Sequence, residues 1–289
     1  IHLGSHYDTV VNAGAFDGIL GVLIGIAVVE AIVESKHPFN HNLSVLAFCD
    51  EEGVRFNTTF LGSAYLSGQF EEEWLHKEDE YGKTLGEWLV DRAESIDMIV
   101  NAYKTPYIRP QDVFLESHIE QGPILEKSNH ALGVFTKIAA QLRSEIILTG
   151  CAGHAGTIPA SLRNDPLPVA SEMILAVNRI CKSDELIRST VGHLEVIPNA
   201  SNVIPGTVKF SIDMRYPDLK GLRRVHNKLS QEIKSIAKRS DLKFEYKLVH
   251  EASDAQLDQR LTDILAESCE VMQGSSPRMF SGAGHDSMK

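Results

Sequence analysis

The sequence predicts an α/β protein in which a ferredoxin-like α+β domain is inserted into a larger mixed-sheet domain. Short apolar runs that stop at acidic residues alternate with helical patterns in the first part of the chain, and a β-α-β-β-α-β order follows after residue 137. A chain of 289 residues is long enough for two domains. We expect a first domain at 1–136 and 252–289, and the inserted domain at 137–251.

In the first domain, strand and helix signals alternate around glycine-rich and acidic loops. The chain opens on a strand end and the loop "GSHYDTVVNAGAFDG", followed by the apolar run Ile19–Val33, which predicts a buried helix. That run is about fifteen residues long and contains Glu30, so it is too short for a membrane span. "LSVLAFCDEEG" predicts a strand that ends in three acids, and "DVFLESHIEQGPILE" predicts another strand that runs into polar residues.

Between these two strands, the stretch from Ser67 to Tyr107 has a charged, helical pattern. We expect its packing residues to be Trp74, Leu85, Trp88 and Leu89.

The inserted domain combines several strands with two long helices. The strands "RSEIILTG" and "TVKFSIDMRYP" are separated by a helical pattern at Pro166–Ser183, and a helix at Leu219–Arg239 and the strand "LKFEYKLV" complete the set. A further amphipathic helix at Leu257–Val271 and the loop "SGAGHD" return the chain to the first domain. The inserted domain therefore resembles a lid.

Composition narrows the range of partners and locations. The net charge is −11, and the absence of a Lys/Arg block argues against nucleic acid, so we expect a small-molecule ligand and no membrane contact. The four cysteines are widely spaced, without a C-x-x-C pair, which favours reduced core thiols and a cytoplasmic location.

His6 and Asp8 form an H-x-D pattern in the opening loop. A carboxylate two residues away from a histidine can hold the second ring nitrogen and fix the tautomer. Such pairs are also common in turns, so this pattern alone does not establish a site.

Asp17, Glu51, Glu52 and His118 extend this pattern, because each lies at a predicted strand end or in a glycine-rich loop. Open α/β sheets bind ligands at the carboxyl ends of their strands. Successive side chains of an extended segment point in opposite directions, so one of the two glutamates can bind a metal while the other faces a substrate. Histidine and carboxylate ligands without thiolates suit a hydrolytic Zn²⁺ or Mn²⁺ site.

Several motifs recur in the order and approximate spacing of one known family. They are "GSHYDTVVNAGAFDG", "DEEGVRF", "SHIEQGPILE", "GHAGTIP" with Arg163, "PNASNVIPG", "DMRYPD" and "SGAGHD". Over nearly its whole length the chain resembles the dinuclear-metal amidohydrolases of the M20 class. The branch it resembles contains N-carbamoyl-L-amino-acid hydrolases, allantoate amidohydrolases and yeast-type β-ureidopropionases.

The resemblance implies a site with two divalent metal ions, Zn²⁺, Mn²⁺ or Co²⁺. It makes His6 and His118 ligands of one ion, Glu52 a ligand of the other, and Asp17 the bridge, with Glu51 as the general base. In related M20 peptidases an acid usually takes the position of His118, so "HIEQG" favours the carbamoyl and ureido branch. The resemblance also implies a cis peptide bond after Asp17.

For the lid, the resemblance implies contacts with substrate and with a second subunit. His154 would polarise the substrate carbonyl from the partner subunit of a homodimer formed through the lid, and Asn202 and Arg215 would grip a substrate carboxylate. Three further residues would complete the pocket: Gln121, Gly284 and His285. Four histidines match no motif, and we expect them to be structural or on the surface: His130, His193, His226 and His250.

The family pattern extends beyond this sequence at both ends. A further metal-ligand histidine is expected after "GAGHD", and an additional segment is expected ahead of Ile1, so we expect the catalytic domain to be truncated here.

The expected reaction is metal-dependent hydrolysis of the ureido C–N bond of an N-carbamoyl-L-amino acid or a related small ureido acid. Its products are an amino acid, ammonia and carbon dioxide. The alternatives are an allantoate amidohydrolase, an M20 peptidase or acylamino-acid deacylase, and a catalytically inactive homologue.

Overall fold

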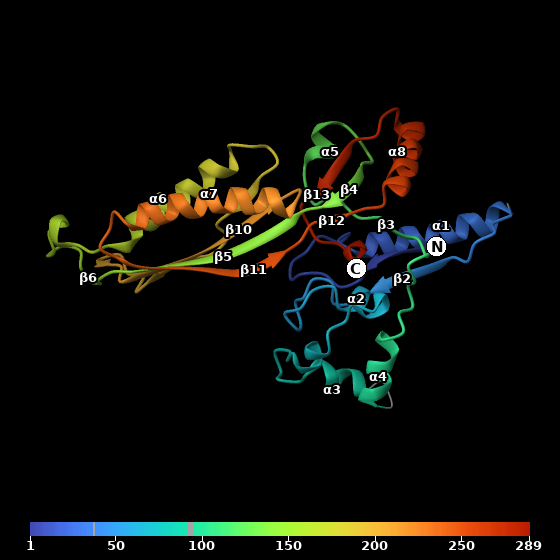
Figure 1. Cartoon of the computed structure of the whole chain (residues 1–289), viewed down its shortest axis with the longest axis horizontal. Helices are drawn as coiled ribbons and strands as arrows, with labels where there is room; N and C mark the ends of the chain where they lie inside the picture. The colour runs from blue at the N-terminus through green and yellow to red at the C-terminus, as the bar shows by residue number, and fades with distance from the viewer. Residues whose placement is uncertain (37, 92–94) are drawn as a thin grey trace. The chain divides into compact units, whose positions relative to one another are not determined.

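The computed structural model describes residues 1–36, 38–91 and 95–289. The chain forms two compact units, one made of Ile1–Ile124 with Gly284–Lys289 and the other of Leu125–Ala283 (Figure 1). The predicted α/β class with a lid is confirmed. The domain bounds expected from the sequence, 1–136 with 252–289 and 137–251, stay a prediction.

A parallel three-stranded sheet is the centre of the first unit. Its strands are β1 (His2–His6), β2 (Ser44–Phe48) and β3 (Phe114–Glu116), in the order β2-β1-β3 (Figure 1). His6 pairs with Phe48, and Gly4 pairs with Glu116. The loops that follow the three strands therefore leave the sheet at one edge, which is where the sequence places the candidate ligands.

Helix α1 (Ile19–Ser35) forms as predicted, but its predicted burial is wrong for most of its surface. Gly21, Val22 and Gly25 are buried, whereas Leu23 is 54% exposed and Val33 is 72% exposed. The helix is apolar over most of its surface, and the narrow face with the two glycines meets the strands of this unit. Among the described residues, no helix is long and apolar enough to cross a membrane.

The predicted helical stretch from Ser67 to Tyr107 is confirmed for the residues that the structure describes. Residues 92–94 lie outside the described residues. It contains η1 (Glu72–His76), α3 (Leu85–Val90) and α4 (Ile96–Tyr103), and α2 (Leu61–Ser67) ends where it begins. They pack around a small core, with Leu85 buried and Trp74, Trp88 and Leu89 partly buried against it, as predicted. The short helix α5 (Ile124–Lys127) follows β3, at the point where the chain passes from the first unit to the second.

The second unit contains the ferredoxin-like lid sheet. Its strands are β5 (Ala140–Thr149), β7 (Arg188–Thr190), β8 (Leu194–Ile197), β10 (Thr207–Tyr216) and β11 (Lys243–Ala252). The order β11-β5-β10-β7, with antiparallel pairing throughout, is that of the predicted β-α-β-β-α-β arrangement. Helices α6 (Pro166–Cys181) and α7 (Leu219–Ala237) lie on one face of this sheet (Figure 1), and Asp165 and Asp218 cap their first turns.

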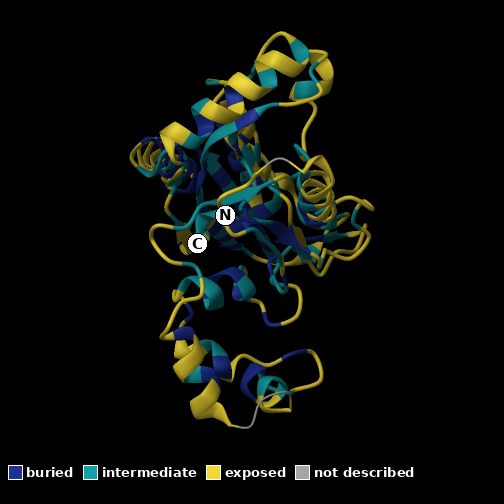
Figure 2. Cartoon of the chain, turned by 90° about the vertical axis from the view of Figure 1, so that its right-hand side faces the viewer, coloured by how far each residue is buried: buried dark blue, intermediate teal, exposed yellow. Residues whose placement is uncertain are grey.

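Strand β10 shows the two-residue alternation of a sheet that is covered on one face. Phe210, Ile212 and Met214 are at most 1% exposed and belong to the core beneath the helices. The residues between them, Asp213 and Arg215 among these, are only partly buried on the opposite face. Figure 2 shows buried residues along the strands and exposed ones on the outer surfaces of the helices.

The remaining elements form two small sheets, one α-helix and two short 3-10 helices. They are β4 (Val134–Ile138), β6 (Gly153–His154), η2 (Ala160–Leu162), β9 (Val203–Ile204), β12 (Ala255–Gln256), α8 (Gln259–Gln273), β13 (Arg278–Ser281) and η3 (Asp286–Met288). Strands β12, β4 and β13 form one sheet, and β6 pairs with β9.

All four cysteines are free thiols, as predicted. Their predicted position in the core is wrong, because Cys151 is exposed and the other three are only partly buried.

Candidate metal centre

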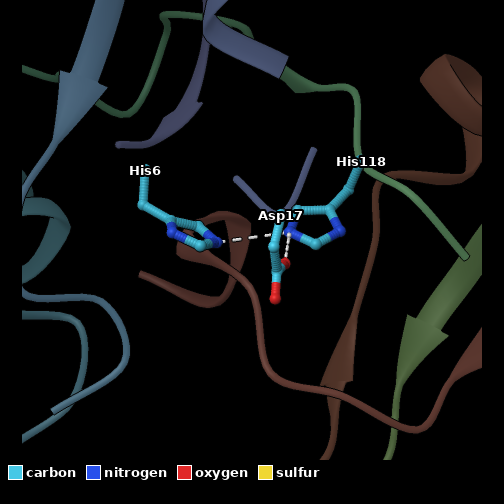
Figure 3. A group of neighbouring side chains, drawn as sticks. All are labelled: His6, Asp17 and His118. Atoms are coloured by element: carbon cyan, nitrogen blue, oxygen red, sulfur yellow. Dashed lines mark hydrogen bonds and ion pairs between the residues drawn. The ribbon is translucent and has the colours of Figure 1, made fainter. Parts of the chain in front are cut away.

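Three side chains from separate segments of the first unit point toward one another. His6 is the last residue of β1, His118 follows β3, and Asp17 lies in the glycine-rich loop before α1. The Nε2 atoms of His6 and His118 are 3.2 Å apart, and Oδ1 of Asp17 is 3.4 Å from Nε2 of His118 (Figure 3). The structure therefore brings together three residues that the sequence predicts as ligands.

Backbone carbonyl groups fix the tautomer of both histidines. Nδ1 of His6 lies 2.7 Å from the carbonyl oxygen of Asp8, and Nδ1 of His118 lies 2.9 Å from that of Ile119. A carbonyl oxygen only accepts, so Nδ1 carries the hydrogen in each ring. Nε2 is left with its lone pair, and this is the atom that each histidine turns toward the other.

The donor set fits a divalent metal ion. Ligands about 2.0–2.1 Å from a tetrahedral zinc ion lie about 3.3–3.4 Å from one another, which is close to the 3.2 and 3.4 Å separations observed. The side chains of His6, His118 and Asp17 are only 3%, 5% and 11% exposed. Two imidazole nitrogens and a carboxylate, shielded from water at this spacing, could hold a divalent metal ion.

A second group shares His6 and adds the two glutamates that follow β2. The donor atoms of His6, Glu51 and Glu52 all lie within 4.8 Å of one another, and Oε2 of Glu51 is 4.0 Å from Nε2 of His6. Glu51 is buried, and Glu52 is half-buried. Asp17 and Glu52 fall in different groups, so the bridging role of Asp17 stays a prediction.

The loop that carries the glutamates is anchored at both sides. Asp50 and Gly53 have left-handed backbone conformations, with φ of 55° and 68°, which turn the chain sharply around Glu51 and Glu52. Beyond the turn, Arg55 stacks on Trp88, with its Cζ atom 4.1 Å from the ring centroid, and also donates to Asp79 at 3.2 Å. The helical stretch thus holds the loop from outside.

The prediction that the Asp8 carboxylate holds the second ring nitrogen of His6 is wrong. Nδ1 of His6 meets the backbone carbonyl of Asp8, whereas the Asp8 carboxylate is 3.9 Å from that nitrogen. The carboxylate accepts hydrogen bonds from the backbone amides of Glu51 and Glu52 instead, each at 3.2 Å. The turn after β1 brings the carbonyl closer to the ring, and the side chain of Asp8 positions the glutamate loop.

Two further acids lie near Glu51: Asp286, which is buried, and Glu116, which is partly buried. Burial, followed by the charges of Asp286, Glu52 and their neighbours, raises the pKa of Glu51 to about 9. Burial and the charge of Glu116 raise the pKa of Asp286 to about 8. Glu116 accepts hydrogen bonds from the Ser5 hydroxyl at 2.9 Å and from the Ser287 amide at 3.0 Å. Their positions, at the end of β3 and directly after His285 in "SGAGHD", were the signals available in the sequence.

The predicted pocket residues of the first unit also surround the two histidines. The rings of His285 and His118 are 4.6 Å apart, and burial together with the charges of His118 and His6 lowers the pKa of His285 to about 3. A Cβ atom at Gly284 would lie 2.5 Å from the Phe60 ring, so a larger residue there would displace that ring. Gln121 donates to both carboxylate oxygens of Asp17, at 3.2 and 3.4 Å.

His154 and Asn202 lie close together in the lid unit, His154 on β6 and Asn202 directly before β9. His154 pairs with Val203, the amide of Ala155 donates to the carbonyl of Asn202 at 3.0 Å, and both predicted residues are exposed. Nδ1 of His154 accepts a hydrogen bond from the Gly156 amide at 3.0 Å, so Nε2 carries the ring hydrogen. Arg215 lies on β10 of the same unit.

The expected cis peptide bond after Asp17 is wrong. In the described part of the chain, the cis bond is that between Ile197 and Pro198. Gly18 has a φ of 69°, so the chain turns after Asp17 through the glycine backbone with a trans bond.

Buried imidazole and carboxylate donors at the carboxyl edge of a parallel sheet, with a buried glutamate beside them, are typical of metal-dependent hydrolases. The chain belongs to the peptidase family M20/M25/M40, whose family model matches residues 2–289. The predicted family is thereby confirmed.

Similar proteins narrow the branch of this family. The chain is 37% identical to an N-carbamoyl-L-amino-acid amidohydrolase of Pseudomonas sp. (strain NS671), covering 100% of this chain and 70% of that protein. It is 36% identical to allantoate deiminase 1 of Glycine max, covering 99% of this chain and 65% of that protein. A crystal structure of an amidase of the hydantoinase/carbamoylase family from Burkholderia multivorans matches with a TM-score of 0.87 at 35% identity, covering 99% of this chain and 68% of that one.

Proposed function

We propose that this protein hydrolyses the ureido C–N bond of N-carbamoyl-L-amino acids or a related small ureido acid, releasing an amino acid, ammonia and carbon dioxide. The observation that carries this proposal is the position of His118, from "HIEQG", 3.2 Å from His6 and 3.4 Å from Asp17. A histidine at this position favours the carbamoyl and ureido branch over the peptidases. The similarity to an amidohydrolase of carbamoyl amino acids supports the same substrate class.

The two donor groups support a site for two divalent ions, Zn²⁺, Mn²⁺ or Co²⁺. His6, Asp17 and His118 would hold one ion, and Glu52 would be a ligand of the second. When bound, such ions activate water near neutral pH and polarise a carbonyl oxygen.

Glu51 is the group proposed to move protons. It is buried beside the shared ligand His6, and its raised pKa of about 9 describes a carboxyl that retains a proton readily. Nearby positive charge lowers such a pKa toward neutrality, where a group both accepts and donates a proton. Glu51 would take a proton from the attacking water and deliver it to the leaving nitrogen.

The lid residues are proposed to bind the rest of the substrate. His154 presents an Nε2–H donor to the carbonyl oxygen, from the partner subunit of a homodimer formed through the lid. Asn202 and Arg215 would hold the substrate carboxylate, and the pocket would be completed by Gln121, Gly284 and His285. The free thiols are consistent with a cytoplasmic location.

A substrate panel tests this proposal. The protein, loaded in turn with Zn²⁺, Mn²⁺ and Co²⁺, is assayed for product release from N-carbamoyl-L-amino acids, allantoate, 3-ureidopropionate, dipeptides and N-acyl amino acids. We expect turnover of ureido acids at least ~10-fold faster than that of dipeptides and N-acyl amino acids, a difference of roughly 1.4 kcal/mol in transition-state binding. Preference for dipeptides or N-acyl amino acids would contradict the proposal, as would the absence of both metal binding and turnover.

Allantoate is the second candidate, because the chain is as similar to a plant allantoate deiminase as it is to the carbamoyl amidohydrolase. Both substrates offer a ureido group and a carboxylate to the same residues. The relative turnover of the two compounds in the panel decides between them.

A further inference from the structure

Asp213 and Arg215 lie side by side on the face of the lid sheet that α6 and α7 leave uncovered. They are two residues apart on β10, so their side chains leave the strand on the same side. Arg143 is the register partner of Asp213 on β5, and Gln141 is the partner of Arg215. The side chains of Asp213 and Arg215 are 26% and 30% exposed, so the pair is partly shielded from water.

The Asp213 carboxylate contacts one edge of the Arg215 guanidinium at two points. Nε of Arg215 donates to Oδ1 at 3.0 Å, and Nη2 donates to Oδ2 at 3.4 Å. On the other branch, Nη1 donates to the carbonyl oxygen of Gly282 at 2.6 Å. A guanidinium has five N–H donors, so one N–H on each of Nη1 and Nη2 has no hydrogen-bond partner among the residues that the structure describes.

Asp213 is itself held in place by two other side chains. Its Oδ2 atom accepts from Nε2 of Gln141 at 2.6 Å and from Nε of Arg143 at 3.1 Å. Burial acts to raise the pKa of Asp213, but the hydrogen bond and charge of Arg215, with help from Arg143 and Gln141, lower it overall. The carboxylate is therefore ionised and fixed, which makes it a firm anchor for a flexible arginine side chain.

We propose that Asp213 is a positioning residue that pre-orients Arg215, occupying one edge of the guanidinium so that the two remaining terminal N–H groups are presented together to a substrate carboxylate. This inference rests on the proposed function, in which Arg215 grips that carboxylate. An arginine fork held in advance loses less freedom on binding than one that must be ordered by the ligand. Asp213 thereby sets affinity for acids without touching the substrate.

The test compares an acidic substrate with a matched neutral one. The metal-loaded protein is assayed with an N-carbamoyl-L-amino acid and with its carboxamide, for the wild type, Asp213→Asn, Arg215→Lys and the double variant. For Asp213→Asn we expect KM for the acid to rise about tenfold with little change in kcat, and KM for the carboxamide to stay the same. In the double variant, KM for the acid should be no higher than in Arg215→Lys, because the two residues act as one unit.

A matched control removes a similar ion pair from the same two strands. Lys209 of β10 and Glu145 of β5 form an ion pair at 2.7 Å, with side chains 38% and 24% exposed. Glu145→Gln should leave KM and kcat unchanged for both the acid and the carboxamide. Thermal unfolding is measured for every variant, and Asp213→Glu, which displaces the carboxylate while keeping its charge, replaces Asp213→Asn if the latter does not fold.

The outcomes separate this inference from the proposed function. If Arg215→Lys raises KM for the acid but not for the carboxamide, and the Asp213 variants change neither KM, the positioning role is wrong and the carboxylate clamp stands. If Arg215→Lys affects the acid and the carboxamide equally, the clamp is wrong and the positioning role is refuted with it. A higher KM for the acid in the double variant than in Arg215→Lys would also overturn the inference.

Discussion

Gly18 occupies a position at which a side chain would collide with a metal-ligand candidate. A Cβ atom there would lie 2.3 Å from Cε1 and Nδ1 of the His6 ring, and the φ of 69° is one that other residues rarely adopt. The glycines of the opening loop are thus not equivalent. A Cβ atom at Gly14, a few residues earlier, would meet none of the described residues within 4 Å, and the φ of Gly14 is not positive.

Replacing these two glycines should therefore have opposite consequences. Gly18→Ala must displace the His6 ring or distort the turn, and we expect a destabilisation of about 1–3 kcal/mol together with weaker binding of the divalent ion. Gly14→Ala should change neither quantity measurably. Urea unfolding and metal titration of the two variants provide the comparison, and equal effects at both positions would contradict this reading of the loop.

Substitutions of Glu51 and of Glu52 should have different effects, the first on proton transfer and the second on metal binding. Glu51→Gln preserves shape but removes basicity, so we expect bound metal to be retained and kcat to fall by at least ~10²-fold. Glu52→Gln removes a charged ligand and should lower metal affinity first. Metal content after dialysis and kcat at saturating metal distinguish the two, and exchanged phenotypes would reverse the assignment.

The sequence was sufficient to identify the donor residues but not their contacts. His6, Asp17, Glu52 and His118 could be predicted because each follows a strand or lies in a glycine-rich loop. The contact of Asp8 could not, because an H-x-D pattern does not determine whether the carbonyl or the carboxylate reaches the ring. Asp286 was missed because its burial depends on residues far away in the chain.

At the scale of elements, His226 connects helix α7 to the lid sheet. Its Nε2 atom is 2.8 Å from the Tyr246 hydroxyl on β11 and 3.4 Å from the Ser144 hydroxyl on β5. Burial, assisted by the charge of Lys234 and opposed by that of Glu251, lowers the pKa of His226 from its usual 6.5. This histidine matches no motif and was expected to be structural or on the surface, and its contacts with Tyr246 and Ser144 are structural.

This lowered pKa predicts a loss of stability in acid. Below about pH 6.5 the unfolded chain binds a proton at His226 before the folded chain does, so the free energy of unfolding falls as the pH decreases. In His226→Gln this contribution is absent. The difference in unfolding free energy between wild type and variant should therefore shrink from pH 7.5 to pH 5.5 in urea titrations, whereas a constant difference would exclude the effect.

The elements themselves were predictable where the apolar periodicity was strong. Helices α6, α7 and α8 and the long lid strands lie within a few residues of their expected positions. The burial of α1 was not predictable, because an all-apolar helix looks the same in sequence whether one face or every face is covered. Only the small residues Gly21 and Gly25 mark the side that contacts the sheet, and a Cβ atom at Gly25 would lie 3.2 Å from Val45.

At the scale of the whole molecule, the order of motifs along the chain predicted the fold class and the family, both of which are confirmed. The division into units follows from contacts between residues distant in sequence, which no local pattern records. Both tryptophans, Trp74 and Trp88, lie in the unit that carries the candidate metal centre. Their fluorescence is therefore a reporter of that unit.

Metal binding should stabilise this unit in particular. A ligand that binds only the folded state adds about 2.7 kcal/mol at a hundredfold excess over its dissociation constant. We expect the thermal transition followed by tryptophan fluorescence to shift upward with Zn²⁺ or Mn²⁺ and downward with a chelator. Amide exchange should slow more in β1 than in β5 and β10, and an unchanged fluorescence transition would argue against the site.

The central position of β1 has a consequence for how the protein folds. His6 and His118 are 112 positions apart in the chain, yet they meet because β1 pairs with both β2 and β3. The long connections must close before any two of the ligands lie within reach of one ion, and closing them is slow compared with forming local helices. We therefore expect metal ions to bind after the sheet has assembled. The ligand-bearing loops would reach their final conformation last, after the strands have paired in their order.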